Sequence, residues 1–233
     1  MLIKYFKQYM KITRGITDKS VNHYITGVNS INALLERYDF PVRNIFAVSS
    51  EVELNAVKTF LETNEEFSEK DSIGHHMYSV AFNHFYRFAC SDEVFFRKNI
   101  TTMDIAIAKP SRITTDATQW KRNQIVIAQA IAGAKHCCEY SYDHHTFIAR
   151  SSGKAYMEGH HLIPLKSQPK FECSIDVYAN VVCLCPNCHR LMHFGRDKER
   201  IYMAESFYEH RSERLAKSGL DISKKDFLDL VVV

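Results

Sequence analysis

Residues 184–193 read Leu-Cys-Pro-Asn-Cys-His-Arg-Leu-Met-His and combine two patterns that are typical of metal-binding proteins. Cys185 and Cys188 are separated by two residues, which is the spacing of a zinc knuckle. His189 and His193 stand four residues apart, so a helix here would place both imidazoles on one face, where they can bind one ion. The stretch therefore predicts a metal-binding segment.

Two upstream elements extend this pattern. His160 and His161 follow Met157-Glu158-Gly159 and precede an apolar run, which favours a strand. Asn180 lies in a second β-prone run, Ala-Asn-Val-Val, shortly before the cysteines. A pair of histidines, a later asparagine and a histidine-bearing helix in this order favour a metal site over five unrelated polar residues.

This segment resembles the HNH family of ββα-metal nucleases, and its paired histidines are similar to those of the nuclease colicins. The resemblance covers about sixty of the 233 residues. It implies that a catalytic divalent cation, Mg²⁺ or Mn²⁺ or a similar ion, is bound by His160, His189 and His193. It also implies that His161 is the general base and that the side-chain carbonyl of Asn180 orients it.

The residue types suit phosphodiester hydrolysis. A neutral imidazole titrates near pH 6.5, so His161 can take a proton from water at physiological pH. A cation held by three imidazoles keeps open positions for the scissile phosphate and the leaving oxygen. Arg190, next to His189, is a candidate phosphate contact, although a solvated helix face explains it equally well.

The zinc knuckle lacks the earlier Cys-x-x-Cys pair that many HNH proteins have, because the position after Cys138 that should hold a second cysteine is Ser141. A structural zinc requires a closed shell of four ligands. We therefore expect a Cys₃His zinc site made of Cys138, His144, Cys185 and Cys188, with His145 and Cys137 as alternatives for one vertex each. In the competing interpretation no zinc binds, and the two later cysteines pack beneath the helix.

Composition and charge place few limits on function. The chain has 45% apolar residues and a formal net charge of +3, which permits a polyanionic partner without demonstrating one. No segment approaches the roughly 18 to 20 apolar residues of a membrane helix, and charges follow the first residues where a signal peptide would have an apolar core. We expect a cytoplasmic protein without membrane contact, in which clustered cysteines bind metal rather than form disulfides.

The expected fold class is α+β. We predict a helical N-terminal domain over residues 1–108, a candidate DNA-recognition module, and an HNH nuclease domain with a zinc knuckle and C-terminal helices over residues 109–233. Apolar spacing and capping signals predict helices. Four predicted helices have approximate ranges: Val21 to Leu35, Gly74 to Cys90, Thr118 to Gly133, and Asp197 to near Gly219. A further helix is predicted to begin at a capping box formed by Ser50 and Glu53, and a short one is predicted just before Val231.

The leading functional hypothesis is a metal-dependent endonuclease that cleaves double-stranded DNA. The layout of a helical domain before an HNH core resembles bacterial restriction or defence nucleases. Two alternatives are a zinc-stabilised DNA-binding protein with an inactive core and a nuclease that cleaves RNA. A double-strand cut by an enzyme with one site favours a homodimer.

A basic N-terminal patch could contact phosphates or be solvated; it comprises Lys4, Lys7, Lys11 and Arg14.

Overall fold

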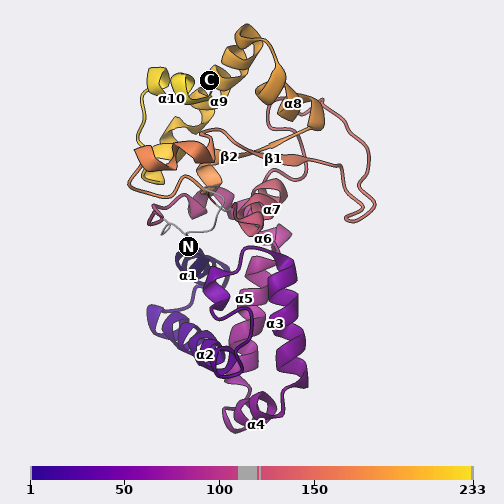
Figure 1. The fold of residues 1–233 in the computed structure, drawn as a ribbon, viewed down its shortest axis with the longest axis vertical. Coiled ribbons are helices and arrows are strands. Elements are labelled where there is room, and N and C mark those ends of the chain that lie inside the picture. The colour runs from indigo at the N-terminus through magenta and orange to yellow at the C-terminus, as the bar shows by residue number, and fades with distance from the viewer. Residues whose placement is uncertain (1, 110–119, 121, 232–233) are drawn as a thin grey trace. The chain divides into compact units, whose positions relative to one another are not determined.

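A computed structural model describes residues 2–109, 120 and 122–231, apart from the side chain of Arg14. Its chain forms two compact units, residues 1–92 and 93–233. The first unit contains α1 (Leu2–Arg14), α2 (Asp18–Arg37), η1 (Ile45–Ala47), α3 (Glu51–Thr63), α4 (Glu65–Ile73) and α5 (Met77–Ala89). The second contains α6 (Glu93–Asn99), η2 (Ile100–Met103), α7 (Gln124–Gly133), β1 (Glu158–His161), η3 (Leu165–Lys170), η4 (Tyr178–Asn180), β2 (Val181–Leu184), α8 (Pro186–Phe194), α9 (Asp197–Lys217) and α10 (Lys224–Val231) (Figure 1).

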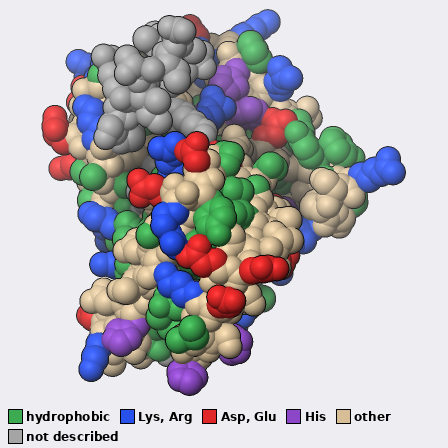
Figure 2. All heavy atoms as spheres, turned by 60° about the horizontal axis from the view of Figure 1, so that its bottom comes forward, with side chains coloured by type: hydrophobic (Ala, Val, Ile, Leu, Met, Phe, Trp, Pro, Cys, Tyr) green, Lys and Arg blue, Asp and Glu red, His purple; other side chains and the backbone are tan. Residues whose placement is uncertain are grey.

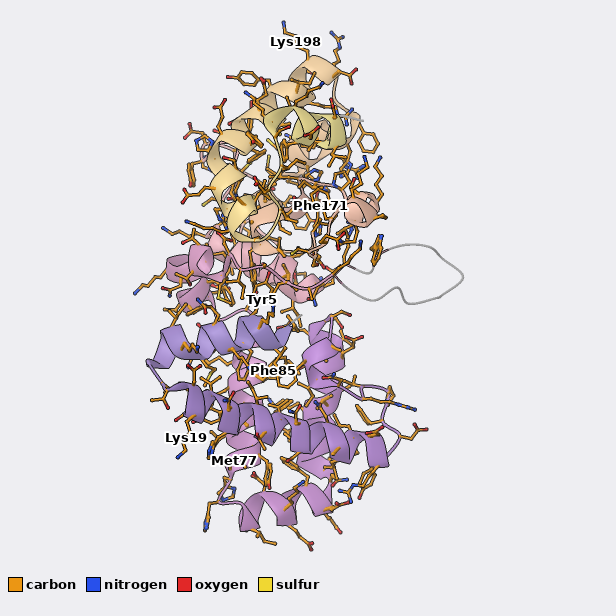
Figure 3. The ribbon with its side chains drawn as sticks, turned by 90° about the vertical axis from the view of Figure 1, so that its left-hand side faces the viewer. Tyr5, Lys19, Met77, Phe85, Phe171 and Lys198 are labelled. Atoms are coloured by element: carbon orange, nitrogen blue, oxygen red, sulfur yellow. The ribbon has the colours of Figure 1, made fainter. Side chains whose placement is uncertain are left out.

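The first unit is a helical bundle around an aromatic core. Phe85 of α5 lies among the helices, whereas Lys19 points outward (Figure 3). The Phe85 ring meets the Phe6 ring edge to face at a centroid distance of 5.3 Å, a favourable aromatic geometry. Helix α2 packs along α5, and a Cβ added at Gly27 would lie only 2.8 Å from Ala81 Cβ. Glycine at this position therefore lets the two helices approach closely.

The helix starts in this unit differ in detail from the predicted ones. The Ser50 hydroxyl accepts a hydrogen bond from the backbone N–H of Glu53 at 3.3 Å, as a capping box requires. The Glu53 carboxylate, however, accepts from the N–H of Ser49 at 2.6 Å, so the second half of the box is shifted by one residue. Helix α5 begins at Met77 rather than Gly74 because His75 and His76 have φ values of 50° and 62°, outside the helical region.

Lysines cover the outer face of α1. Lys4, Lys7 and Lys11 are exposed, and the ammonium group of Lys11 lies 2.6 Å from the Asp18 carboxylate. The predicted N-terminal patch is therefore accessible to solvent at these three positions.

The boundary between the two units falls earlier than the predicted domain boundary after residue 108. Helix α6 belongs to the second unit because it packs on α7, and its Phe96 ring lies 6.0 Å from the ring of Tyr178. Residues 93–108 therefore contribute to the core of the second unit rather than to the helical bundle.

The second unit is helix-rich with one small sheet, in agreement with the predicted α+β class. Strands β1 and β2 pair antiparallel, with His160 opposite Val182 and His161 opposite Val181. Helix α7 packs against both strands. A Cβ added at Gly159 would lie 2.4 Å from Cγ2 of Ile127, so glycine is needed where α7 meets β1.

The helix that leads into the cysteine cluster starts later than the predicted Thr118. Helix α7 begins at Gln124, and the side chain of Asn123 caps it by accepting from the N–H groups of Ile125 and Val126. Residues 118, 119 and 121 lie outside the described residues.

The C-terminal helices α9 and α10 lie where the sequence predicted them. None of the described helices is long and apolar enough to cross a bilayer.

Candidate active site and metal centres

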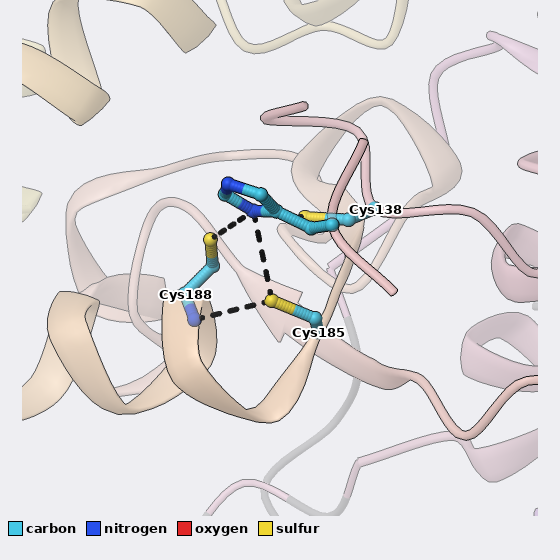
Figure 4. A group of neighbouring side chains, drawn as sticks. Cys138, Cys185 and Cys188 are labelled. Carbon is cyan, nitrogen blue, oxygen red and sulfur yellow. Dashed lines mark hydrogen bonds between the residues drawn. The ribbon is translucent and has the colours of Figure 1, made fainter. Parts of the chain in front are cut away.

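One cluster consists of Cys138, His144, Cys185 and Cys188, the four residues expected to bind zinc (Figure 4). The N-terminal end of α8 supplies the last two. The Nδ1 atom of His144 lies 3.7, 3.8 and 3.2 Å from the sulfur atoms of Cys138, Cys185 and Cys188, respectively. A tetrahedral zinc with ordinary Zn–S and Zn–N bonds separates a sulfur from a nitrogen by about 3.6 Å. The four side chains therefore fit a closed zinc shell.

The thiols of this cluster differ in their ease of ionisation. Burial opposes ionisation of Cys138, but hydrogen bonds from the backbone at Cys185, Ser141 and Tyr140 lower its pKa to about 7. Burial and the neighbouring Cys185 and Cys138 raise the pKa of Cys188. Several thiolates cannot share this small space without a compensating cation, and a divalent ion of the zinc type would supply that charge.

The alternative ligands lie outside this cluster. His145 is exposed, and the Cys137 thiol instead lies 3.6 Å from the carbonyl oxygen of Lys135. The Ser141 hydroxyl accepts a hydrogen bond from the N–H of Asp143 at 3.4 Å. Among the described residues, only His144 brings a nitrogen ligand to the three cysteines.

The second cluster consists of the imidazoles of His160, His189 and His193. Ligand nitrogens of the three rings lie within 4.8 Å of one another, and the ring centroids are 4.8 to 5.1 Å apart. His160 comes from β1, whereas the other two lie one helical turn apart on α8. A single cation can bind three nitrogens gathered in this way.

Burial keeps the His160 ring neutral. Desolvation, followed by the charges of His189 and His193, lowers its pKa to about 3. Burial also lowers the pKa of His193. Neutral imidazoles offer the lone pairs that a metal ion needs.

Glu158 holds one of these imidazoles in place. Its carboxylate lies 2.5 Å from Nδ1 of His189, so the Nε2 atom of that ring remains available as a ligand. Glu158 stands two residues before His160, and alternate residues of a strand share one face. This alternation could have identified Glu158 from the sequence, but Glu158 is not among the predicted site residues.

His161, the next residue of β1, is not one of the three clustered imidazoles. It is buried, and its Nε2 atom lies 2.9 Å from Oδ1 of Asp176. The other carboxylate oxygen of Asp176 accepts a hydrogen bond from the backbone N–H of Asn123 at 2.8 Å. Asp176 was not predicted as a site residue, because nothing in the local sequence pattern links it to His161.

Among the described residues, the Asn180 side chain forms no hydrogen bond with His161. Its Oδ1 accepts from the N–H of Ile163 at 2.7 Å, and its Nδ2 donates to the carbonyl oxygens of Ile163 and Ile175 at 2.9 and 2.8 Å. The expectation that the Asn180 carbonyl orients His161 therefore has no hydrogen bond to support it here. Asn180 instead ties together the two chain segments that flank η3.

Arg211 fixes the same region from α9. Its guanidinium is buried and donates to the carbonyl oxygens of Tyr178, Ala179 and Val181. It also pairs with the carboxylate of Glu139, which accepts from the N–H of Cys183 at 2.7 Å. Helix α9 therefore holds η4, β2 and the segment beside Cys138 in one arrangement.

Arg190 lies on the exposed side of α8. Its guanidinium carbon stands 5.7 Å from the centre of the Phe194 ring, and no described carboxylate forms a salt bridge with it. It is accessible to an anionic ligand.

Part of this chain is similar to known proteins. Residues 131–196, which contain both clusters, match the family model described as HNH endonuclease. These residues therefore form a domain of the HNH endonuclease family. The chain is also 34% identical over 96 residues to the type IV methyl-directed restriction enzyme EcoKMcrA of Escherichia coli (strain K12). That alignment covers 41% of this chain but only 32% of the length of the restriction enzyme. No solved structure matches the chain significantly.

Proposed function

We propose that this chain is a divalent-cation-dependent endonuclease that hydrolyses phosphodiester bonds of double-stranded DNA. The observation that carries the proposal is the group of three imidazoles from β1 and α8, within a domain of the HNH endonuclease family. A role in a restriction or defence system rests on the similarity to a restriction enzyme over part of the chain.

His160, His189 and His193 would hold the catalytic cation, which would neutralise charge on the scissile phosphate and on the leaving oxygen. His161 would take the proton from the attacking water. Because the Asp176 carboxylate accepts a hydrogen bond from Nε2–H of His161, the lone pair lies on Nδ1, the atom that would receive the proton. We therefore assign the positioning of His161 to Asp176 instead of Asn180.

The Cys138, His144, Cys185 and Cys188 cluster would hold a structural zinc. All four positions of the tetrahedron are filled by protein, so no position is open for substrate. This zinc would fix the N-terminal end of α8 and thereby the two histidines on that helix.

Cleavage of plasmid DNA tests the proposal. The wild-type protein should nick or linearise plasmid in Mn²⁺ or Mg²⁺, and EDTA should stop the reaction. His161→Ala should reduce the rate by about 10²- to 10⁴-fold, the usual contribution of a general base. His210→Ala is a matched control because this histidine is exposed on α9 and, within the described part of the chain, its ring bonds only to the carbonyl oxygen of Ser206.

The alternatives give different results in the same assay. Folded protein that binds DNA but cleaves nothing in any divalent cation would indicate an inactive core. Faster cleavage of tRNA than of plasmid would indicate an RNA substrate. His161→Ala that nicks plasmid at the wild-type rate would disprove the assignment of the base. A homodimer, with one site for each strand, is expected if linear product appears without accumulation of nicked circles.

A further inference from the structure

A short hairpin, residues 147–156, projects from the second unit just before β1. Its two arms are joined by an antiparallel bridge between Ile148 and Ala155 and by hydrogen bonds from Ala149 N to Lys154 O and from Tyr156 N to Phe147 O, at 2.8 and 2.9 Å. Figure 2 shows it as a projection at the right-hand edge, with hydrophobic side chains along it and a basic side chain at its tip. We call this segment the arm hairpin.

The arm hairpin carries a pair of stacked aromatic rings. The rings of Phe147 and Tyr156 lie 4.8 Å apart and are inclined by only 14°. Phe147 is nevertheless 64% exposed, so most of its surface faces solvent. An exposed ring stacked in this way offers a flat surface for another planar group.

An open hollow lies beside this pair. It is lined by Phe147, Ala149, Arg150, Ser151 and Tyr156. Arg150 is exposed, and no described carboxylate forms a salt bridge with it. The hollow therefore combines an aromatic surface with an accessible guanidinium, which are the groups that bind the base and the phosphate of a nucleotide.

The arm hairpin is joined directly to the imidazole cluster. The hydroxyl of Tyr156 donates to Oε1 of Glu158 at 3.1 Å, and Oε2 of the same carboxylate contacts His189. Tyr156 and Glu158 are two residues apart, or about 7 Å along an extended chain. A strand held at the cluster would therefore pass close to the hollow.

We propose that the hollow of the arm hairpin binds one unstacked nucleotide of the strand held at the imidazole cluster. The base stacks on the aromatic pair through Phe147, and Arg150 binds a neighbouring phosphate. This inference rests on the proposed nuclease function, since the cluster is what brings a nucleic-acid strand to the hairpin. It assigns the arm hairpin a role in substrate binding that is separate from the hydrolytic step.

Binding of single-stranded DNA without cleavage tests this assignment. The probe is a fluorescein-labelled oligonucleotide, and a second copy carries 2-aminopurine, whose fluorescence falls when it stacks on an aromatic ring. Measurements in EDTA exclude hydrolysis. The zinc cluster is kept filled by adding the chelator only briefly to zinc-loaded protein, and the zinc content is measured afterwards.

Phe147→Leu keeps an apolar side chain but removes the aromatic face, so binding should weaken by about 5- to 100-fold and 2-aminopurine quenching should disappear. Arg150→Ala should weaken binding and reduce the slope of log K against log salt by about 0.7, the value for one phosphate of a single strand. Ile148→Ala is the matched control, because Ile148 is also 64% exposed but does not line the hollow. It should bind within about twofold of wild type.

The site is refuted if the wild-type protein does not bind the oligonucleotide, if Phe147→Leu binds as wild type does, or if Ile148→Ala weakens binding as much as Phe147→Leu. Failure of the nuclease proposal looks different: plasmid stays intact in every divalent cation while Phe147-dependent binding persists. All three side chains are exposed, so circular dichroism should show that each variant keeps the wild-type fold.

Discussion

Replacement of Asn180 by alanine separates a structural role of this residue from a catalytic one. The side chain is fully buried and makes three hydrogen bonds to the backbone of Ile163 and Ile175, whose side chains are also fully buried. Each bond contributes about 1 kcal/mol net, and each backbone group left without a partner adds to that cost. The variant should lose about 3 to 5 kcal/mol of unfolding free energy.

Thermal unfolding followed by circular dichroism measures this loss. A domain of this size melts about 2 to 4 °C lower per kcal/mol, so Asn180→Ala should lower the melting temperature of the second unit by about 6 to 20 °C. Asn180→Asp should be similarly unstable, because a carboxylate can accept from Ile163 N–H but cannot donate to the two carbonyls. Asn22→Ala, at an exposed position of α2, should change little.

The opposite pattern would refute this reasoning. If Asn180 acts only by orienting His161, Asn180→Ala would keep the wild-type melting temperature and lose plasmid cleavage. In that case the hydrogen bonds to Ile163 and Ile175 would not be what the residue contributes.

Three further substitutions give distinct results. Cys185→Ser should abolish binding of one zinc per chain, measured by elemental analysis, and lower the melting temperature of the second unit, because zinc binding is coupled to folding; full zinc occupancy would contradict the ligand assignment. Gly159→Ala should destabilise the packing of α7 by about 1 to 3 kcal/mol in urea unfolding, since its Cβ would overlap Ile127, and wild-type stability would mean that the helix can shift. Asp176→Asn should reduce plasmid cleavage by about 10²-fold or more while Mn²⁺ binding, measured calorimetrically, stays unchanged; equal loss of both would indicate a merely structural role.

Local spacing paired Cys185 with Cys188 and His189 with His193, and the resemblance to the HNH family added His160; in the structure these side chains lie in two clusters. Two residues between Cys185 and Cys188 and four positions from His189 to His193 place side chains on one helical turn, whatever the rest of the chain does. The choice of His144 followed from the need for a fourth ligand. These inferences depend on chemistry within a few residues.

Long-range partners were beyond such reasoning. Asp176 forms a hydrogen bond with His161, which lies 15 residues earlier in the sequence, and no periodic pattern of apolar residues connects the two. Asn180 forms its hydrogen bonds with segments on both sides of η3. The extent of the helical unit likewise depends on packing between distant segments. The phenylalanines of α6 are compatible with either unit, and only their packing on α7 assigns them to the second.

The position of Arg211 affects how this domain can be excised or transplanted. The match to the HNH endonuclease family ends at residue 196, yet the guanidinium that holds the carbonyls of Tyr178, Ala179 and Val181 belongs to a helix beyond that point. A fragment cut at the end of the family match would leave those carbonyls and the Glu139 carboxylate without their shared donor. A working fragment for protein engineering should therefore extend through Lys217 and begin no later than Glu93.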